Sequence, residues 1–342
     1  MARLAAILGA VWRAFQRGEK SIASLAGNNF FLVALLFLGK AGSFLFLIMG
    51  LVVLFPLSTD PLRKIPPSRL ALWPLEKREH FLLRAISPWL NPMTWAIVAL
   101  ALWALRGSVT VGLWGLAAGL VAAGFVISEL PLPRGAAMWR RVPHFPGELD
   151  QLIRKNLREM LSTLDFYCAL LLSLSAALYR VFGPPLPSEA FMAMTVLVVI
   201  ALSSYAQCLF GLDGEGGWSR YRLLPVSGWR ILAAKDAAFL LVLAVLVAPL
   251  APLAGLGAGF VALAMGRRSS VLDPRPQTRW RFSAGASPVY GIGQVVLMAF
   301  AASAIFLTSW LIFFPCVALW AGSLWWYGQK MEERDSGRLE AS

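Results

Sequence analysis

The residues with most potential for chemistry lie in one charged segment, residues 211–236, which interrupts two long apolar stretches. Two carboxylates, Asp213 and Glu215, stand among several glycines, and the segment ends with Lys235 and Asp236. Charged groups are costly inside hydrocarbon, so this segment must lie at the water interface or beyond it. Its chemistry would be ionic and hydrogen-bonded contact with a soluble partner.

The same segment predicts a short helix over residues 219–224. Glycines before it let the chain leave an apolar helix and turn sharply. Pro225 ends the short helix, and Ser227 is suited to begin the next one as an N-cap. The residues available for burial in the short helix are Tyr221, Leu223 and Leu224.

Residue types that support catalysis occur elsewhere without partners at useful spacing. The two histidines, His80 and His144, lie in separate polar loops. The Gly-Lys pair that ends at Lys40 is followed by Ala41 rather than Ser or Thr, so the chain lacks a phosphate-binding loop. We therefore expect no enzyme activity, no cofactor and no metal site in this chain.

The elements that must position the charged segment are membrane-spanning helices. Of the 342 residues, 58% are hydrophobic and only 14% are charged, whereas a soluble domain is usually about half apolar at most. The apolar stretches are continuous and lack period-two alternation, which predicts helices rather than a β-barrel. The expected fold class is an all-α, polytopic helical membrane protein.

The net charge of +13 could indicate nucleic-acid binding, but its distribution indicates membrane topology. All Lys and Arg residues except Lys40, Arg106 and Arg180 lie between the apolar stretches. Such clustering is typical of the positive-inside rule, and it also attracts anionic lipid headgroups. We therefore expect membrane lipid as a partner and no nucleic acid. The expected location is the bacterial cytoplasmic (inner) membrane, with the C-terminus in the cytoplasm.

Residues 136–342 are predicted to form a six-span region, since a span needs about 20 mostly apolar residues. Before the first span, residues 147–161 combine an apolar face with a charged one, which predicts an amphipathic helix at the membrane interface. Six spans place the basic connections on one side. The predicted spans are 164–182, 191–209, 237–250, 253–265, 289–310 and 311–326.

Residues 1–135 are predicted to form a separate N-terminal membrane region. It begins with an interfacial helix, and spans near 30–57 and 93–128 flank a basic cytoplasmic loop at 59–91. The stretch 30–57 is long for one crossing and short for two, so both alternatives stay open. The whole chain would then have nine to ten membrane-crossing or re-entrant segments.

A weak internal repeat links the two regions. Residues 69–75 (Arg-Leu-Ala-Leu-Trp-Pro-Leu) and residues 220–226 (Arg-Tyr-Arg-Leu-Leu-Pro-Val) each precede a close pair of apolar stretches. Transporters are often built from duplicated halves. The repeat predicts a second coupling segment, with the candidate residues Arg69, Leu70, Trp73, Pro74 and Leu75.

The order of amphipathic helix, spans and charged segment over residues 147–330 resembles the permease subunits of ATP-binding-cassette (ABC) exporters of the type-two class. Their first cytoplasmic loop commonly has an acidic residue, Gly, a Leu-rich helix, Pro-aliphatic-Ser and a Lys. Ala234 departs from the usual Gly before that Lys, and the N-terminal region adds spans. The matching positions here are Asp213 or Glu215, Gly217, Leu223, Leu224, Pro225, Val226, Ser227 and Lys235.

The resemblance implies that the short helix, including Tyr221, is a coupling helix that docks onto a separate ABC ATPase (nucleotide-binding) subunit. It also implies a second permease copy and an exporter driven by ATP hydrolysis in that separate subunit. Residues of the coupling segment would contact the partner and carry out no catalysis.

Two other interpretations stay open. A proton- or ion-coupled secondary transporter normally has carboxylates or histidines within its spans, whereas Asp165 and Glu129 lie only near span ends. A membrane protein of non-transport function could carry residues 211–236 as an ordinary interfacial loop. Polar residues within the spans, such as Ser203 and Gln294, are expected to join helices by hydrogen bonds rather than to line a pathway.

Overall fold

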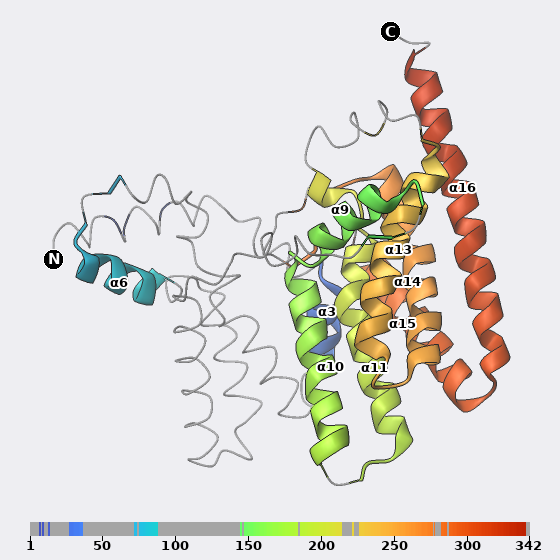
Figure 1. Ribbon diagram of the computed structural model, residues 1–342, viewed down its shortest axis with the longest axis horizontal. Coiled ribbons are helices and arrows are strands. Elements are labelled where there is room, and N and C mark those ends of the chain that lie inside the picture. The colour runs from blue at the N-terminus through green and yellow to red at the C-terminus, as the bar shows by residue number, and fades with distance from the viewer. Residues whose placement is uncertain are drawn as a thin grey trace. The chain divides into compact units, whose positions relative to one another are not determined.

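The computed structural model divides the chain into two compact units, and every element it describes is a helix (Figure 1). One unit comprises Met1–Ala23 and Ala34–Leu132, and the other comprises Ser24–Val33 and Pro133–Ser342. The structure describes residues 7, 9, 13, 27–36, 72–73, 75–87, 144–145, 147–183, 185–213, 221, 226–275, 277, 282–285 and 287–339.

In the first unit, the longest described element is the helix α6 (Lys77–Ile86). Its first turn is stabilised by Glu79, whose carboxylate accepts the backbone N–H of Glu76 at 3.1 Å. Trp73 and Leu75 of the predicted second coupling segment lie just before α6. The predicted N-terminal interfacial helix and the spans at 30–57 and 93–128 lie largely outside the described residues, as do Arg69, Leu70 and Pro74.

The described residues of the second unit form six long helices, which run up and down beside one another (Figure 1). The shorter helix α9 (Asp150–Met160) precedes them, and the short helices η4 (Gly211–Asp213) and η5 (Trp310–Ile312) connect some of them. The six long helices are α10 (Leu164–Phe182), α11 (Ser188–Ala206), α13 (Gly228–Val247), α14 (Pro252–Leu272), α15 (Pro288–Leu307) and α16 (Phe313–Leu339).

Four helices in the described residues are long and apolar enough to cross a membrane, which supports a membrane protein. They are α10, α11, α15 and the stretch Trp310–Glu333 that contains most of α16. The nine to ten segments predicted from the sequence are not confirmed. Helix α13 falls short because it carries Arg230, Lys235 and Asp236, and α14 because it carries Arg267 and Arg268.

Helix α14 is the centre of this bundle, because it packs against α11, α13, α15 and α16. Two helix backbones can approach each other closely only where the residues between them are small. At Gly266, for example, an added Cβ would lie only 2.5 Å from the carbonyl oxygen of Ala206. The backbone of α14 therefore lies directly against the end of α11.

The helices extend beyond the apolar stretches predicted as spans. Helix α13 begins at Gly228, where the sequence predicts a helix with Ser227 as its N-cap, and runs without a break into the span predicted from residue 237, so Lys235 and Asp236 lie inside it. The span predicted to end at residue 265 continues to Leu272 as α14, and the one predicted to end at residue 326 continues to Leu339 as α16. A helix satisfies its own backbone hydrogen bonds, so it does not have to end where the hydrocarbon ends.

Candidate functional site

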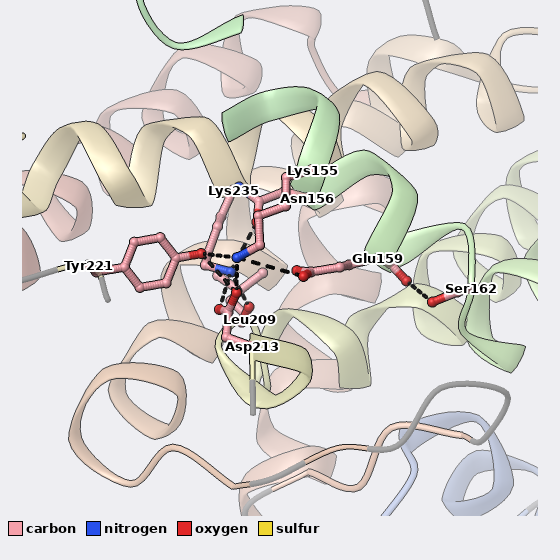
Figure 2. A network of polar contacts seen from close by, with 8 residues as sticks. All are labelled: Lys155, Asn156, Glu159, Ser162, Leu209, Asp213, Tyr221 and Lys235. Atoms are coloured by element: carbon pink, nitrogen blue, oxygen red, sulfur yellow. Dashed lines mark hydrogen bonds and ion pairs between the residues drawn. The ribbon is translucent and has the colours of Figure 1, made fainter. Parts of the chain in front are cut away.

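A cluster of charged and polar side chains lies where the segment 211–236 leaves the bundle, at the end near α9 (Figures 1 and 2). We call it the charged cluster. Helix α9 supplies three of its members, and η4, the stretch between η4 and α13, and α13 supply one each. The members are Lys155, Asn156, Glu159, Asp213, Tyr221 and Lys235.

Helix α9 lies within residues 147–161, where the sequence predicts an amphipathic helix. It packs along α13, and Asn156 and Glu159 are only 1% and 5% exposed. The sequence predicts the charged residues of this helix on the face opposite its apolar residues. Asn156 and Glu159 are nevertheless buried, because that side of α9 faces the ammonium group of Lys235.

Lys235 is the centre of the charged cluster. Its Nζ donates to Asp213 Oδ2 at 2.8 Å, to Asn156 Oδ1 at 3.1 Å and to the carbonyl oxygen of Leu209 at 2.7 Å. A lysine ammonium has three N–H donors, so each donor has a partner. The Nζ atom also lies 4.7 Å from the centre of the Phe210 ring, which stabilises the buried positive charge further.

Asp213 receives a second ammonium group from α9. Lys155 Nζ forms an ion pair with Asp213 Oδ1 and also donates to Tyr221 Oη at 3.0 Å. The Tyr221 hydroxyl donates to the same Asp213 oxygen at 2.9 Å. Asp213 thereby links α9 and α13 to Tyr221.

The electrostatics of the charged cluster keep Asp213 ionised. Burial by itself would raise the pKa of the Asp213 carboxyl, but Lys235 and Lys155 outweigh it and lower the pKa below its usual 3.8. The pKa of Tyr221 is raised, first by burial and then by the negative charge of Asp213, so Tyr221 remains a neutral hydrogen-bond donor. Neither Asp213 nor Tyr221 therefore titrates near neutral pH, so both keep the forms that their hydrogen bonds require.

The start of α13, which follows the stretch 214–227, is attached to α16. The backbone N–H of Gly228, which begins α13, donates to Glu332 Oε1 at 3.1 Å. A Cβ on Gly228 would lie 2.8 Å from the carbonyl oxygen of Gly328, and one on Gly328 would lie 2.6 Å from Trp229 Cβ. We call this contact the α13–α16 junction. Ser227 occupies the predicted N-cap position of α13, but its side chain makes no capping hydrogen bond.

A second buried ion pair lies deeper, between α13, α14 and α16. Arg267 Nη2 pairs with Asp236 Oδ2, which also accepts the indole N–H of Trp320 at 2.8 Å. Both charged side chains are fully buried. Within the described residues, Asp236 Oδ1 and two guanidinium nitrogens of Arg267 have no partner. The sequence does not indicate that these two side chains are buried against each other.

The structure thus brings together three predicted coupling residues, Asp213, Tyr221 and Lys235. Val226 and Ser227 lie immediately before α13. The remaining predicted residues, Glu215, Gly217, Leu223, Leu224 and Pro225, lie outside the described residues.

Several members of the site were not predicted from the sequence. The grouping of Lys155, Asn156 and Glu159 could have been predicted from the sequence. Residues three or four positions apart in a helix are neighbours on its surface, so these polar side chains lie close together. The contact of Glu332 and Gly328 could not, because they lie about 100 residues from Gly228 in the sequence.

No metal site accompanies these clusters in the described part of the chain, where no three His, Cys, Asp or Glu side chains are grouped to hold an ion. Comparison of the chain with protein-family models, with curated proteins and with solved structures finds no match. The function must therefore be inferred from the site itself.

Proposed function

We propose that this chain is the membrane-spanning permease subunit of an ATP-driven exporter. The supporting observation is that the stretch 214–227, between η4 and α13, is anchored to the helix bundle on both sides. Asp213 ties its beginning to α9 and α13, and Gly228 ties its end to α16. A segment that only bridged two spans would not need buried ion pairs, which are costly to form.

In this proposal, a separate ABC ATPase subunit contacts residues 215–225 from the cytoplasm. ATP-driven movement of that subunit pushes on the segment, and the two anchors transmit the push to α9, α13 and α16 as a rigid-body motion. The complete transporter would contain a second permease copy in the bacterial cytoplasmic membrane, with the C-terminus in the cytoplasm. Residues 69–75 would supply a second contact.

The test is the ATPase activity of the complex isolated from its native membrane. Replacement of Leu223, Leu224 or Pro225 should abolish transport-coupled stimulation of the ATPase while membrane insertion stays normal. The control is Leu186→Ala, in the connection at the opposite end of the bundle. If no ATPase co-purifies, or if the coupling-segment variants behave like Leu186→Ala, the proposal is wrong.

A proton- or ion-coupled carrier is the second candidate, and the buried Asp236–Arg267 pair favours it. Ionisable residues inside a membrane bundle often mark ion or proton pathways. Asp165 is also fully buried, at the start of α10. Transport that depends on a proton gradient and persists without ATP would support this candidate over the exporter.

A further inference from the structure

Residues 27–33 occupy a polar surface formed by the helix bundle of the second unit. The surface comprises side chains of α10, α11 and α15 and the backbone of residues 283–285. We call residues 27–33 the Asn-Asn segment and the surface the amide site. The side chains of the amide site are Asp165, Ser203, Ser204, Gln207 and Gln294.

Asn28 binds one side of the amide site. Its Nδ2 donates to Asp165 Oδ1 at 2.8 Å and to the carbonyl oxygen of Ser283 at 3.0 Å. The Asn28 side-chain oxygen accepts the backbone N–H of Phe30 at 3.0 Å and so begins the helix α3 (Asn29–Leu36). The residue is fully buried.

Asn29 binds the other side. Its backbone N–H donates to Ser204 Oγ at 2.7 Å, and its Nδ2 donates to Ser203 Oγ and to Gln294 Oε1, both at 2.8 Å. Asn29 is 1% exposed. The donors of both side-chain amides are therefore fully used inside the bundle.

The shape of the site matches the Asn-Asn segment as closely as its hydrogen bonds do. A Cβ on Gly291 would lie 2.4 Å from Asn29 Oδ1, so only glycine leaves room for that amide. The carbonyl oxygen of Gly27 accepts the N–H of Gly285 at 2.8 Å. Phe31 is buried and packs edge-on against Phe282, with ring centroids 4.8 Å apart.

Bonds inside the bundle hold the amide site in position independently of the segment. Ser203 Oγ donates to the carbonyl oxygen of Ile200 at 2.7 Å, and Gln294 Nε2 donates to that of Ala262 at 2.8 Å. Gln207 Nε2 donates to Gln294 Oε1 at 2.5 Å. A site whose side chains are already oriented binds an amide without a further ordering cost.

The chain on both sides of the segment belongs to the other compact unit. Ser24–Val33 clusters with the bundle, whereas Met1–Ala23 and Ala34–Leu132 form the other unit. The Asn-Asn segment is therefore continuous at both ends with chain that belongs to that unit. The net contribution of each hydrogen bond to an amide is modest, because water replaces the bond once the segment leaves.

From these observations we propose that the amide site is a docking surface for an asparagine-bearing segment, which residues 27–33 fill in cis and leave reversibly. Hydroxyl and carboxylate oxygens of the surface accept hydrogen bonds from the primary amides. An apolar contact binds the aromatic residues that follow the two asparagines. The proposal does not rest on the transport function, because it concerns only contacts within this chain.

The test measures maleimide labelling of a cysteine placed at Val33, which is 6% exposed on the segment. The full chain with Val33→Cys is compared with the same chain that also carries Asn28→Ala and Asn29→Ala. Val247→Cys, fully buried on α13, reports unfolding of the bundle. Ser173→Ala, which removes a buried polar side chain outside both the amide site and the charged cluster, is the matched control for Val33→Cys. Site-resolved mass spectrometry separates these cysteines from Cys168, Cys208 and Cys316.

We expect the double alanine variant to label at Val33→Cys at least about tenfold faster, because the four hydrogen bonds that the two side-chain amides donate to the bundle are lost. Labelling at Val247→Cys should not change, and Ser173→Ala should leave Val33→Cys unaffected. An unchanged rate at Val33→Cys would overturn the proposal. So would a joint rise at both cysteines, since the segment would then be an integral part of the bundle.

Discussion

Lys235 illustrates how the bundle tolerates charge at the residue scale, since every N–H of its ammonium group meets an oxygen. Replacing Lys235 with Met removes one of the two ammonium groups that pair with the buried Asp213. Removing one partner of a buried pair costs about 3–5 kcal/mol. We expect Lys235→Met to lower the free energy of unfolding by that order, measured by denaturation in detergent micelles.

The matched control for Lys235 is Arg275, whose ion pair with Asp273 at 3.3 Å is largely exposed. Exposed pairs contribute at most about 1 kcal/mol, so Arg275→Met should leave stability nearly unchanged. Equal losses in the two variants would show that the charged cluster anchors nothing.

The Asp236–Arg267 pair gives a second prediction at this scale. Arg267→Met alone should destabilise the bundle by about 3–5 kcal/mol, because it leaves a fully buried carboxylate unpaired. Asp236→Leu together with Arg267→Met should recover most of that loss, because apolar residues can fill the same space. A double-mutant cycle of unfolding free energies measures the coupling.

The same double variant separates the two candidate functions. If the pair only joins α13, α14 and α16, the double variant should transport normally. If it carries ions or protons, transport should be lost although the stability has recovered. A double variant that remains as unstable as Arg267→Met would contradict the structural role.

The lowered pKa of Asp213 predicts a direction for acid sensitivity. A carboxyl with a lower pKa in the folded state stabilises the fold above its unfolded value, about 4. That contribution is lost as the pH falls through the lowered folded value. We therefore expect the melting temperature to be insensitive to Asp213 from pH 7 to about pH 4 and to fall below it. Asp213→Asn should remove this part of the acid loss, whereas Asp273→Asn should retain it.

At the scale of elements, the α13–α16 junction depends on two glycines. Gly228→Ala and Gly328→Ala would each force a Cβ against backbone or Cβ atoms closer than 3.0 Å. Overpacking of this kind typically costs about 1–3 kcal/mol. We expect both variants to lower the melting temperature and, if the exporter proposal holds, to reduce coupling more than membrane insertion.

Gly322 supplies the control for the junction, since it lies in the same helix α16 and an added Cβ would meet nothing within 4 Å. Gly322→Ala should be neutral or slightly stabilising, because alanine favours helix by up to about 1 kcal/mol. A neutral effect at Gly228 and Gly328 as well would mean that the junction is not closely packed in the membrane.

At the scale of the whole molecule, the structure of the bundle predicts which positions lie on opposite sides of the membrane. Leu186, between α10 and α11, and Arg230, at the start of α13, are exposed at opposite ends of the bundle. In intact cells, an impermeant maleimide should label Leu186→Cys directly and Arg230→Cys only after permeabilisation. Equal labelling of both from outside would contradict a bundle that spans the bilayer.

The helices themselves were predictable from the sequence, because their signals are local. Continuous apolar stretches indicate helical spans, and the stretch 164–182 coincides with the ends of α10. The amphipathic pattern over 147–161 similarly predicts α9. The charge of the connections indicates their topology without knowledge of any contact.

The contacts that make the site were not predictable in this way. Whether Asp236 and Arg267 lie in water or inside the bundle depends on a partner 31 residues away. A buried charge is stable only where an opposite charge or several hydrogen-bonding groups meet it. The same holds for Asn28 and Asn29, whose acceptors lie on helices more than 130 residues later.

The sequence by itself thus indicated a helical membrane protein and the approximate positions of the long helices of the second unit. Only the tertiary structure decided which polar residues are buried and what they bind. The physical reason is that hydrophobicity and helix period are properties of consecutive residues. The state of a charge depends on atoms that folding brings within about 3 Å, from anywhere in the chain.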